Sequence, residues 1–482
     1  MLFDFSFLIY AFFYPLIIVL IILILLDNRE TYQTISWVLL VTFLPILGLI
    51  LFFLFGRNWR PQNKRRKIRN AALFKSASQL LKDIYDIELF TIKEANVNVK
   101  VTRFATLMKL AFAAPFMFPV KAEEIRLYTN GAKKFEDLIT DIENAEKYIH
   151  IEYYIIRSDD LTDRIIKALC AKARQGVEVR IFYDYLGSIS WKNKDKRKLR
   201  DAGAKVYSGK APLDKINYRS HRKIISIDGS IAYIGGMNMS KWYVSGNKKF
   251  DHWRDNHLRI TGNFAIAVEV LFAHYWYTAT KEQLLDAEHV TTKNAMRLAE
   301  GKIVQLIHSG ADTEWNTISQ TYQKLISLAE KYIWLETPYF MPQENIFSSL
   351  INAALSGVEV NLILAGVSDN FLSRNASFTY FKELLTAGAN IFLYTEGFMH
   401  GKAMSIDGKI CTVGSANLDP RSMEINYEAN VVIYNQEFTL QLEQEFVNDL
   451  NNCRKVSLAD IENAGILKRF KWSVCRLLSP LL

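Results

Sequence analysis

Two stretches of the chain repeat one set of residues that can carry acid–base and phosphate chemistry. In each stretch a lysine, an aspartate, a glycine and an asparagine follow a histidine after two, seven, fourteen and seventeen residues. The side chains that can do chemistry are His221, Lys223, Asp228, Asn238, His400, Lys402, Asp407 and Asn417. Two such matches in register make coincidence improbable. The duplicated set predicts two half-sites that close on one anionic substrate.

These residue types suit displacement at a phosphodiester, whose negative oxygens repel a nucleophile. Catalysis therefore needs fixed cations, a nucleophile and an acid for the leaving alcohol. Lys223 and Lys402 supply cations, and the two asparagines and Ser415 supply neutral donors that can bind the phosphate. One neutral imidazole can attack phosphorus, while the other histidine moves the protons. No cluster with metal-ligand spacing occurs, so no cofactor or metal is expected.

Four acidic residues complete the predicted site. Asp228 and Asp407 each precede a glycine between two apolar runs, which predicts a strand, a turn and a strand. Both belong to the motif's catalytic set, although a structural role in the turn is favoured. Asp255 and Glu428 each lie roughly thirty residues after the histidine of their own repeat. They are candidates to orient the imidazoles, and the residues alone allow a surface or turn acid equally well.

The duplication extends beyond the motifs. Residues 145–149 recur at 329–333, and residues 176–179 recur at 357–360. A period this long indicates duplicated domains. Strand and helix patterns alternate in both copies, so we predict an α/β fold of two duplicated domains with mixed sheets. The predicted boundaries are 1–60 for an N-terminal hairpin, 61–125 for a basic linker, 126–290 for the first domain and 291–482 for the second.

The N-terminal segment predicts a membrane protein. Residues 5–26 and 37–55 carry no charge, and at 1.5 Å per residue each can cross an apolar layer of about 30 Å. No basic residue precedes the first stretch, which argues against a signal peptide. Seven basic residues and no acid lie in 57–69, which predicts a cell-membrane protein with two spans, cytoplasmic catalytic domains and affinity for anionic lipids.

Other segments extend the membrane hypothesis. Residues 104–118 are apolar but interrupted by Lys109 and Pro115, so they form either an interfacial helix or a buried one. Residues 467–482 mix basic and aromatic side chains in an amphipathic tail. The net charge of +9 suits an anionic surface, and the two predicted spans favour membrane over nucleic acid. The four cysteines lack metal spacing, which fits reduced thiols.

The flanks of the motifs carry a resemblance to a known family. The quoted segments are NYRSHRK at 217–223, YIGGMN at 233–238, WRD at 253–255, TPYF at 337–340, GSANLDPRS at 414–422 and NYE at 426–428. With the two-span hairpin, they resemble bacterial cardiolipin synthases of the phospholipase D superfamily, which carries two HKD motifs. The resemblance covers essentially the whole chain. One departure is Ala311, where the family usually has proline after the glycine at 310.

The resemblance implies transfer of a phosphatidyl group from one phosphatidylglycerol to the hydroxyl of another, through a phospho-histidine. It implies that His221 is the nucleophile and that His400 is the acid and base. Lys223 and Lys402 would bind the phosphate, and Asp255 and Glu428 match the positions of the histidine partners.

Other functions stay open from the sequence. A phospholipase D or a phosphatidylserine synthase would use water or serine as acceptor, and either reaction needs the same catalytic groups. A nuclease would need a basic groove and a soluble chain, which the hairpin disfavours. A non-enzymatic lipid-binding scaffold would not need both complete motifs. The oligomeric state and the acyl-chain preference have no signal in the sequence.

Overall fold

The computed structural model describes residues 5–26, 31–56, 103–112, 117–209, 217–284 and 301–478. The chain divides into two compact units. The smaller unit comprises mainly Met1–Arg65 with Ala211–Tyr218, and the larger comprises mainly Arg66–Lys210 with Arg219–Pro480. Both repeats therefore belong to one compact unit.

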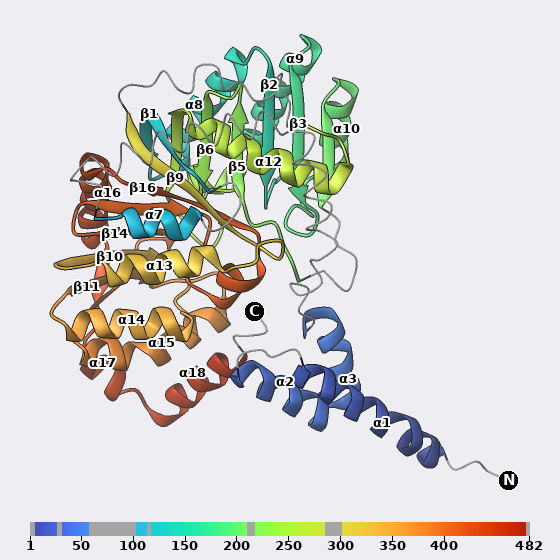
Figure 1. The fold of residues 1–482 in the computed structure, drawn as a ribbon, viewed down its shortest axis with the longest axis vertical. Coiled ribbons are helices and arrows are strands. Elements are labelled where there is room, and N and C mark those ends of the chain that lie inside the picture. Colours follow the sequence, from blue (N-terminus) through green and yellow to red (C-terminus); the bar gives the residue numbers. More distant parts are fainter. Residues whose placement is uncertain are drawn as a thin grey trace. The chain divides into compact units, whose positions relative to one another are not determined.

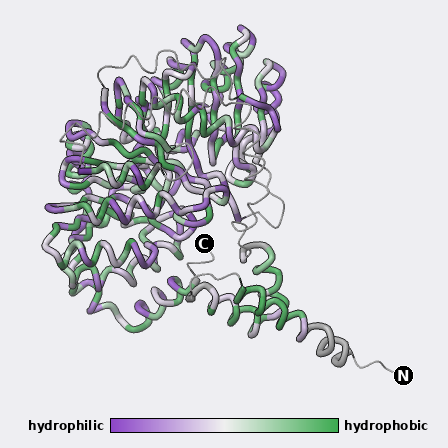
Figure 2. Tube along the Cα trace, viewed as in Figure 1, coloured by the Kyte–Doolittle hydropathy of each residue, from purple (hydrophilic) through white to green (hydrophobic). Residues whose placement is uncertain are grey.

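The smaller unit contains the apolar N-terminal helices, which are mostly green in Figure 2. The first apolar stretch is one helix, α1 (Phe5–Leu26). The second is divided into α2 (Thr31–Phe43), α3 (Pro45–Leu51) and the π-helical turn η1 (Phe52–Gly56), with Pro45 as the first residue of α3. Among the residues that the structure describes, no helix is both long enough and apolar enough to cross a membrane. The predicted spans are thus not confirmed.

The larger unit is built on one fifteen-stranded sheet to which both repeats contribute (Figure 1). The first repeat supplies β1 (Pro119–Tyr128), β2 (Tyr148–Tyr153), β3 (Glu178–Asp184), β4 (Lys205–Gly209), β5 (Lys223–Ile227), β6 (Ile231–Gly235) and β8 (His257–Gly262). The second supplies β9 (Lys302–Ser309), β10 (Tyr332–Thr337), β11 (Glu359–Ala365), β12 (Asn390–Tyr394), β14 (Ala403–Ile406), β15 (Ile410–Gly414), β16 (Glu428–Ile433) and β17 (Cys453–Lys455).

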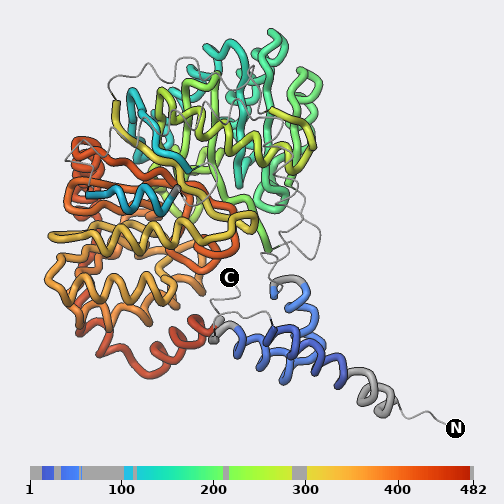
Figure 3. The backbone as a smooth tube through the Cα atoms, in the orientation of Figure 1, coloured from blue at the N-terminus to red at the C-terminus, as the bar shows by residue number. Residues whose placement is uncertain are grey.

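The strand order shows the internal symmetry of the sheet. Read inward from one edge, the first repeat runs β4-β3-β2-β5-β6-β8-β1. From the other edge, inside β17, the second runs β12-β11-β10-β14-β15-β16-β9. The repeats meet where β1 pairs with β9 in antiparallel fashion, and Figure 3 shows their two colour ranges side by side. The prediction of mixed pairing is confirmed, but two separate sheets were expected and the strands form a single one.

Helices cover both faces of the sheet. One set is α8 (Gly131–Asn144), α9 (Asp160–Arg174), α10 (Asn193–Asp201), α13 (Thr317–Ser327), α14 (Glu344–Leu355) and α15 (Phe371–Thr386), and the other is α12 (Phe264–Thr280) and α16 (Gln436–Leu450). On β11, Val360 and Leu362 belong to one buried cluster and Ile363 to another. Alternate side chains of a strand point to opposite faces, so this strand is buried on both sides.

The helix before the first strand resolves an open alternative from the sequence. Helix α7 (Ala105–Phe112) places Leu107, Met108 and Ala111 in the buried cluster of the second repeat, together with Phe104. The interfacial-helix alternative is therefore wrong for these residues, and the buried alternative is correct. The first domain also begins earlier than the predicted residue 126, because β1 starts at Pro119. The predicted boundary at 290 lies outside the described residues.

Both motif hairpins form as predicted. The β5–β6 turn contains Asp228 and Gly229, with φ of 52° and 66°. The β14–β15 turn contains Asp407 and Gly408, with φ of 53° and 66°. Two successive residues with positive φ match the twist of a tight hairpin, and aspartate and glycine tolerate that conformation.

Candidate active site

Backbone pairing between the repeats sets the position of each motif histidine. The amide of His221 donates to the carbonyl oxygen of Tyr427 at 2.9 Å, and the amide of His400 donates to that of Arg254 at 2.7 Å. Near His400, the short strands β7 (Trp253–Arg254) and β13 (Phe398–Met399) form a parallel pair. Tyr427 and Arg254 each directly precede a candidate carboxylate, so the backbone brings each histidine to the carboxylate of the opposite repeat.

The side chains complete this arrangement. Nδ1 of His221 lies 2.9 and 3.0 Å from the two carboxylate oxygens of Glu428. Nδ1 of His400 lies 2.6 Å from Oδ2 of Asp255. An ionised carboxylate can only accept, so each imidazole places its proton on Nδ1 and leaves Nε2 unprotonated in the neutral ring. All four side chains are buried.

The pairing differs from the one that the spacing suggested. Asp255 and Glu428 were expected to meet the histidine of their own repeat, but each meets the histidine of the other repeat. We call His221–Glu428 and His400–Asp255 the crossed pairs. The reason is topological. Asp255 directly follows β7, which pairs with β13 just before His400, and Glu428 directly follows Tyr427, which forms a parallel bridge with Ser220 just before His221.

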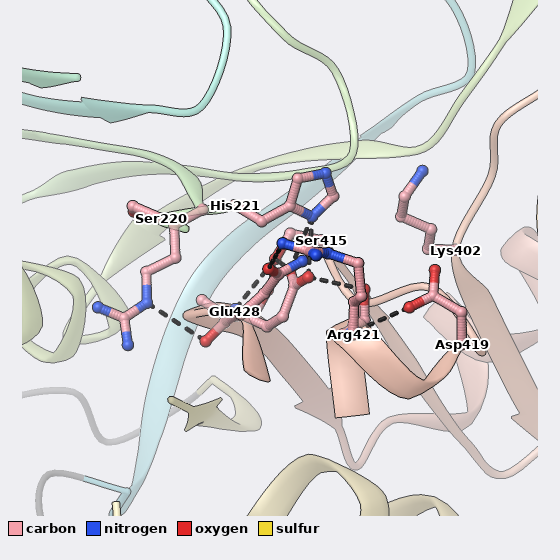
Figure 4. A network of polar contacts seen from close by, with 12 residues as sticks. Ser220, His221, Lys402, Ser415, Asp419, Arg421 and Glu428 are labelled. Carbon is pink, nitrogen blue, oxygen red and sulfur yellow. Dashed lines mark hydrogen bonds and ion pairs between the residues drawn. The ribbon is translucent and has the colours of Figure 1, made fainter. Parts of the chain in front are cut away.

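Hydroxyl groups support one of the crossed pairs. The Ser415 hydroxyl donates to Oε2 of Glu428 at 2.5 Å, and the Ser422 hydroxyl donates to Oε1 at 2.8 Å. Figure 4 shows the His221 ring directed at this cluster. The hydroxyl proton of Ser415 is directed at Glu428 here, and its role as a phosphate ligand stays a prediction. Ser415 and Ser422 hold the carboxylate that holds His221.

The second crossed pair is supported by a lysine. Nζ of Lys402 lies 2.9 Å from Nδ1 of His400 and 2.5 Å from its carbonyl oxygen. Nδ1 of His400 cannot accept from Lys402 and donate to Asp255 at the same time. The 2.6 Å contact to a carboxylate is the stronger, charge-assisted one, so Nδ1 donates to Asp255. The ammonium is then held by the carbonyl oxygen.

Burial governs the protonation of the site. It lowers the pKa of His221 to about 4, against the opposing charge of Glu428. Burial, and then the charge of Lys402, lowers the pKa of His400. Although burial alone would raise the pKa of Asp255 and of Glu428, the nearby cations and imidazoles lower both pKa values. Near neutral pH the free protein therefore holds neutral imidazoles against ionised carboxylates.

Each motif lysine donates to the carbonyl oxygen of the histidine two residues before it, and neither is among the described residues that line the cavity. Lys223 is fully buried and its Nζ donates to the carbonyl oxygen of His221 at 2.6 Å. Burial lowers the pKa of Lys223 to about 7, and it lowers the pKa of Lys402. A buried cation favours an arriving anion, because the anion replaces lost hydration.

Both histidines line one cavity of about 340 Å³ between the repeats. Asn238 and Asn417 line it as well. Asn238 accepts from the amide of Ile155 at 3.2 Å and donates to the Tyr243 hydroxyl at 2.9 Å. Among the described residues, none hydrogen-bonds to the buried Oδ1 of Asn417. The structure thus brings together both predicted asparagines and both histidines.

The two halves of the cavity differ in chemistry. Around His400 the rings of Tyr243, Trp253 and Phe398 have centroids 5.4 to 6.2 Å from the imidazole. Beside His221 lies Tyr154, at 4.7 Å. Asp419 and Arg421 also line the cavity, and Figure 4 shows them close to the His221 cluster. Aromatic rings thus lie beside both histidines and are more numerous around His400, and Arg157 and Asp369 add further charges to the cavity lining.

Sequence reasoning gave no role to several of these residues. Asp419, Arg421 and Ser422 lie in the segment after the second motif. Trp253 lies on β7, two residues before Asp255. The one feature of the sequence that could have pointed to these residues was that they lie close to the motifs in the chain. The sequence does not show how the fold turns these segments toward the cavity. Among the described residues, no group of three or more His, Cys, Asp or Glu side chains is arranged to hold a metal ion.

The two motif aspartates lie on backbone amides and not at the cavity. Asp228 accepts from the amides of Glu146, Lys147 and Tyr148, each at 2.8 Å. Asp407 accepts from the amides at 330, 331 and 332, at 2.8 to 3.3 Å. Neither is among the described residues that line the cavity. Their inclusion in the catalytic set is corrected: each ties its hairpin to the start of β2 or β10.

We therefore expect Asp228→Asn to reduce stability and spare chemistry. Asparagine tolerates the positive φ, but its amide group replaces one acceptor oxygen, so at least one of the three backbone amides loses its acceptor. The free energy of unfolding should fall by about 2 kcal/mol, measured by thermal unfolding, with turnover at permissive temperature nearly unchanged. Asp407→Asn is the matched variant. A loss of turnover without a change in melting would indicate direct chemistry.

Comparisons with known proteins cover most of the chain. The family described as "Cardiolipin synthase, PLD-like domain" matches residues 138–276 and 322–450, one match in each repeat. A family described as the phospholipase D-nuclease N-terminal segment matches residues 16–57. Cardiolipin synthase 2 of Staphylococcus epidermidis is 35% identical over 473 residues, covering 96% of this chain and 95% of that protein.

Two further comparisons are informative. Cardiolipin synthase of Clostridium perfringens is 36% identical over 465 residues, covering 95% of this chain and 96% of that protein. The solved structure of phosphatidylserine synthase from Haemophilus influenzae superposes with a TM-score of 0.60 at 15% identity, over 81% of this chain and 100% of that chain, which supports the fold alone. The chain belongs to the bacterial cardiolipin synthase family, whose members are phosphatidyltransferases of the phospholipase D superfamily.

Proposed function

We propose that the chain joins two phosphatidylglycerol molecules into cardiolipin and glycerol through a phosphatidyl group carried on His221. The observation that carries this proposal is the pair of imidazoles on one cavity, each with Nδ1 held by a carboxylate of the opposite repeat. That arrangement leaves two Nε2 atoms for one phosphorus. One can form a bond to phosphorus while the other moves a proton.

In the first step, Nε2 of His221 attacks phosphorus and the bond from phosphorus to the glycerol oxygen breaks. His400, protonated, gives its proton to that oxygen and glycerol leaves. A phosphodiester anion in the cavity favours protonation of His400, because it adds a negative charge beside a buried imidazole. The low pKa of His221, about 4, keeps that ring unprotonated and nucleophilic.

In the second step, a hydroxyl of another phosphatidylglycerol attacks the same phosphorus. His400 takes the hydroxyl proton, the phosphorus–nitrogen bond breaks and His221 returns to its neutral form. Lys223 and Lys402 offset the charge on the phosphoryl oxygens in both steps. Asn238 and Asn417 donate hydrogen bonds to the same oxygens.

We also propose that the N-terminal helices hold the enzyme at the cell membrane, with the catalytic repeats on the cytoplasmic side. Large apolar side chains of these helices, including Leu26 and Phe43, are exposed, which suits an apolar surrounding. Seven basic residues follow at 57–69, outside the described part of the chain. Phosphatidylglycerol and other anionic lipids are the expected partners.

Product analysis tests the proposed function. The purified full-length chain in vesicles of phosphatidylglycerol and phosphatidylethanolamine should form cardiolipin and glycerol in equal amounts, by mass spectrometry. Chelator should leave the rate unchanged, since lysines supply the cations. Phosphatidic acid as the sole product would indicate water as acceptor. Phosphatidylserine, with serine added, would indicate serine.

The pKa values predict the pH dependence of the reaction. Turnover needs neutral His221, charged Lys223 and protonated His400. The pKa values of His221 and Lys223 are about 4 and about 7, and burial lowers the pKa of His400, so an alkaline limb that neither lysine substitution moves belongs to His400. As pH rises through about 7, Lys223 loses its charge and kcat/KM should fall; as pH falls through about 4, His221 gains a proton and kcat/KM should fall again. Because kcat/KM reports the free enzyme, this is the parameter to measure.

A substitution identifies the group whose loss of a proton causes kcat/KM to fall at alkaline pH. A guanidinium keeps its charge to far higher pH than an ammonium, so Lys223→Arg should lower the rate but move the alkaline limb upward. Lys402→Arg is the matched control. If only Lys402→Arg moves the limb, the group that loses its proton is Lys402 and the assignment to Lys223 is wrong.

A further inference from the structure

The helix near the end of the chain has two apolar faces, of which one is packed. Helix α18 (Ile466–Leu478) buries Trp472 and Cys475 against α15, where the Trp472 ring stacks on Phe378 at 4.9 Å. Four other large apolar side chains are each at least 69% exposed: Ile466, Leu467, Phe470 and Leu477, while Val474 is 37% exposed. Separations of three, four and seven residues place them along one side of the helix. We call these four residues the α18 stripe.

The charges of α18 indicate what covers the stripe. The helix carries Lys468, Arg469, Lys471 and Arg476 and no acidic residue. An exposed apolar stripe flanked by cations is typical of helices that lie in the headgroup region of an anionic bilayer.

A cation of the same helix, beside the stripe, reaches the rim of the catalytic cavity. Nζ of Lys471 lies 5.7 Å from the ring centroid of Phe371, the first residue of α15. That ring is 62% exposed. Its neighbours Asn370 and Ser373 line the cavity that contains both histidines. If α18 lies on lipid, the lipid surface therefore also reaches the mouth of the cavity, where the headgroups of the substrates must enter.

The first repeat has an exposed apolar loop at the equivalent position. Phe371 follows the strand β11, and the loop after the equivalent strand β3 exposes Leu186 and Ile189. Ser188 in this loop donates to the carbonyl oxygen of Tyr154 at 3.0 Å, and Tyr154 lines the cavity. Both repeats thus present apolar side chains beside the same cavity.

We propose that the α18 stripe and Phe371 form an interfacial surface that lies on an anionic bilayer leaflet and opens the catalytic cavity toward lipid headgroups. This inference rests on the proposed function and adds the route by which a membrane-resident substrate reaches the histidines. The apolar side chains enter the leaflet, and the flanking lysines and arginines bind the phosphates of its headgroups.

The test compares two substrates with enzyme held in phosphatidylcholine vesicles. One substrate is long-chain phosphatidylglycerol in the same bilayer, and the other is short-chain phosphatidylglycerol kept below its critical micelle concentration. Leu467→Glu and Phe470→Glu should each lower the rate on bilayer substrate at least tenfold and leave the rate on dissolved substrate unchanged. Leu355→Glu on α14 is the matched control, since Leu355 is 68% exposed, and it should change neither rate.

Several outcomes would overturn the inference. An unchanged rate on bilayer substrate in both stripe variants would do so, as would an equal loss on both substrates. Loss of a cross-linked dimer in the variants would assign the stripe to a second copy of the chain. Arg469→Gln with Lys471→Gln provides a second variant with the stripe intact, and it should raise the phosphatidylglycerol fraction needed for half-maximal rate. If the unmodified enzyme forms no cardiolipin from either substrate, the proposed function fails instead.

Discussion

His400→Ala is expected to halt the enzyme with a phosphatidyl group on His221, when the substrate carries nitrophenol in place of glycerol. Nitrophenol leaves without an acid, so the first step needs only the His221 nucleophile. The second step needs a base for the incoming hydroxyl and stalls. One equivalent of nitrophenol per enzyme should appear as a burst. With phosphatidylglycerol itself, turnover should fall by about 10⁴-fold or more.

His221→Ala should give no burst and no covalent product, since the remaining imidazole of the cavity, His400, serves as acid and base and not as nucleophile. Mass spectrometry of the peptide that contains residue 221 identifies the phosphatidyl group. His252→Ala is the control, because His252 is exposed and outside the cavity lining. A burst in His221→Ala and none in His400→Ala would exchange the two roles.

The crossed pairs predict the second large effect. Glu428→Gln turns the acceptor of His221 into a side chain that can donate, so the ring is held with its proton on Nε2 and cannot attack phosphorus. The burst should slow by about 10³-fold or more, as expected when an amide replaces a carboxylate that fixes a tautomer. Asp255→Asn should spare the burst and slow only the second step.

These two variants separate the crossed arrangement from the simpler one. If each carboxylate served the histidine of its own repeat, Asp255→Asn would abolish the burst and Glu428→Gln would spare it. Ser422→Ala, which removes one hydroxyl from Glu428, should weaken the burst by a smaller factor than Glu428→Gln. Equal melting temperatures of the variants would show that the effects are chemical.

Much of the site could be predicted from the sequence because its signals are local. The spacing of His221 and Lys223, the Asp-Gly turn and the flanking apolar strands all lie within about fifteen residues. The duplication then predicted that His400 would meet His221 at one substrate. Both imidazoles do line one cavity.

The crossed pairing could not be predicted, because it depends on contacts far apart in the chain. His221 and Glu428 are separated by 207 positions, and His400 and Asp255 by 145. Each carboxylate follows its own histidine by a similar interval, so spacing favours the wrong partner. Only the pairing of strands between the repeats decides it. Residues 104–112 show a related difficulty, since an apolar face fits a protein core and a lipid interface equally well.

The crossed pairs also bear on how the enzyme is made. A polypeptide still attached to the ribosome with only its first repeat complete contains His221 and Lys223, but the carboxylate that fixes the imidazole has not been synthesised. We expect unfinished or prematurely terminated chains to be inert toward phospholipids until β16 has emerged and folded. Translation order alone would thus protect the cell from fragments that split lipids with water instead of joining them.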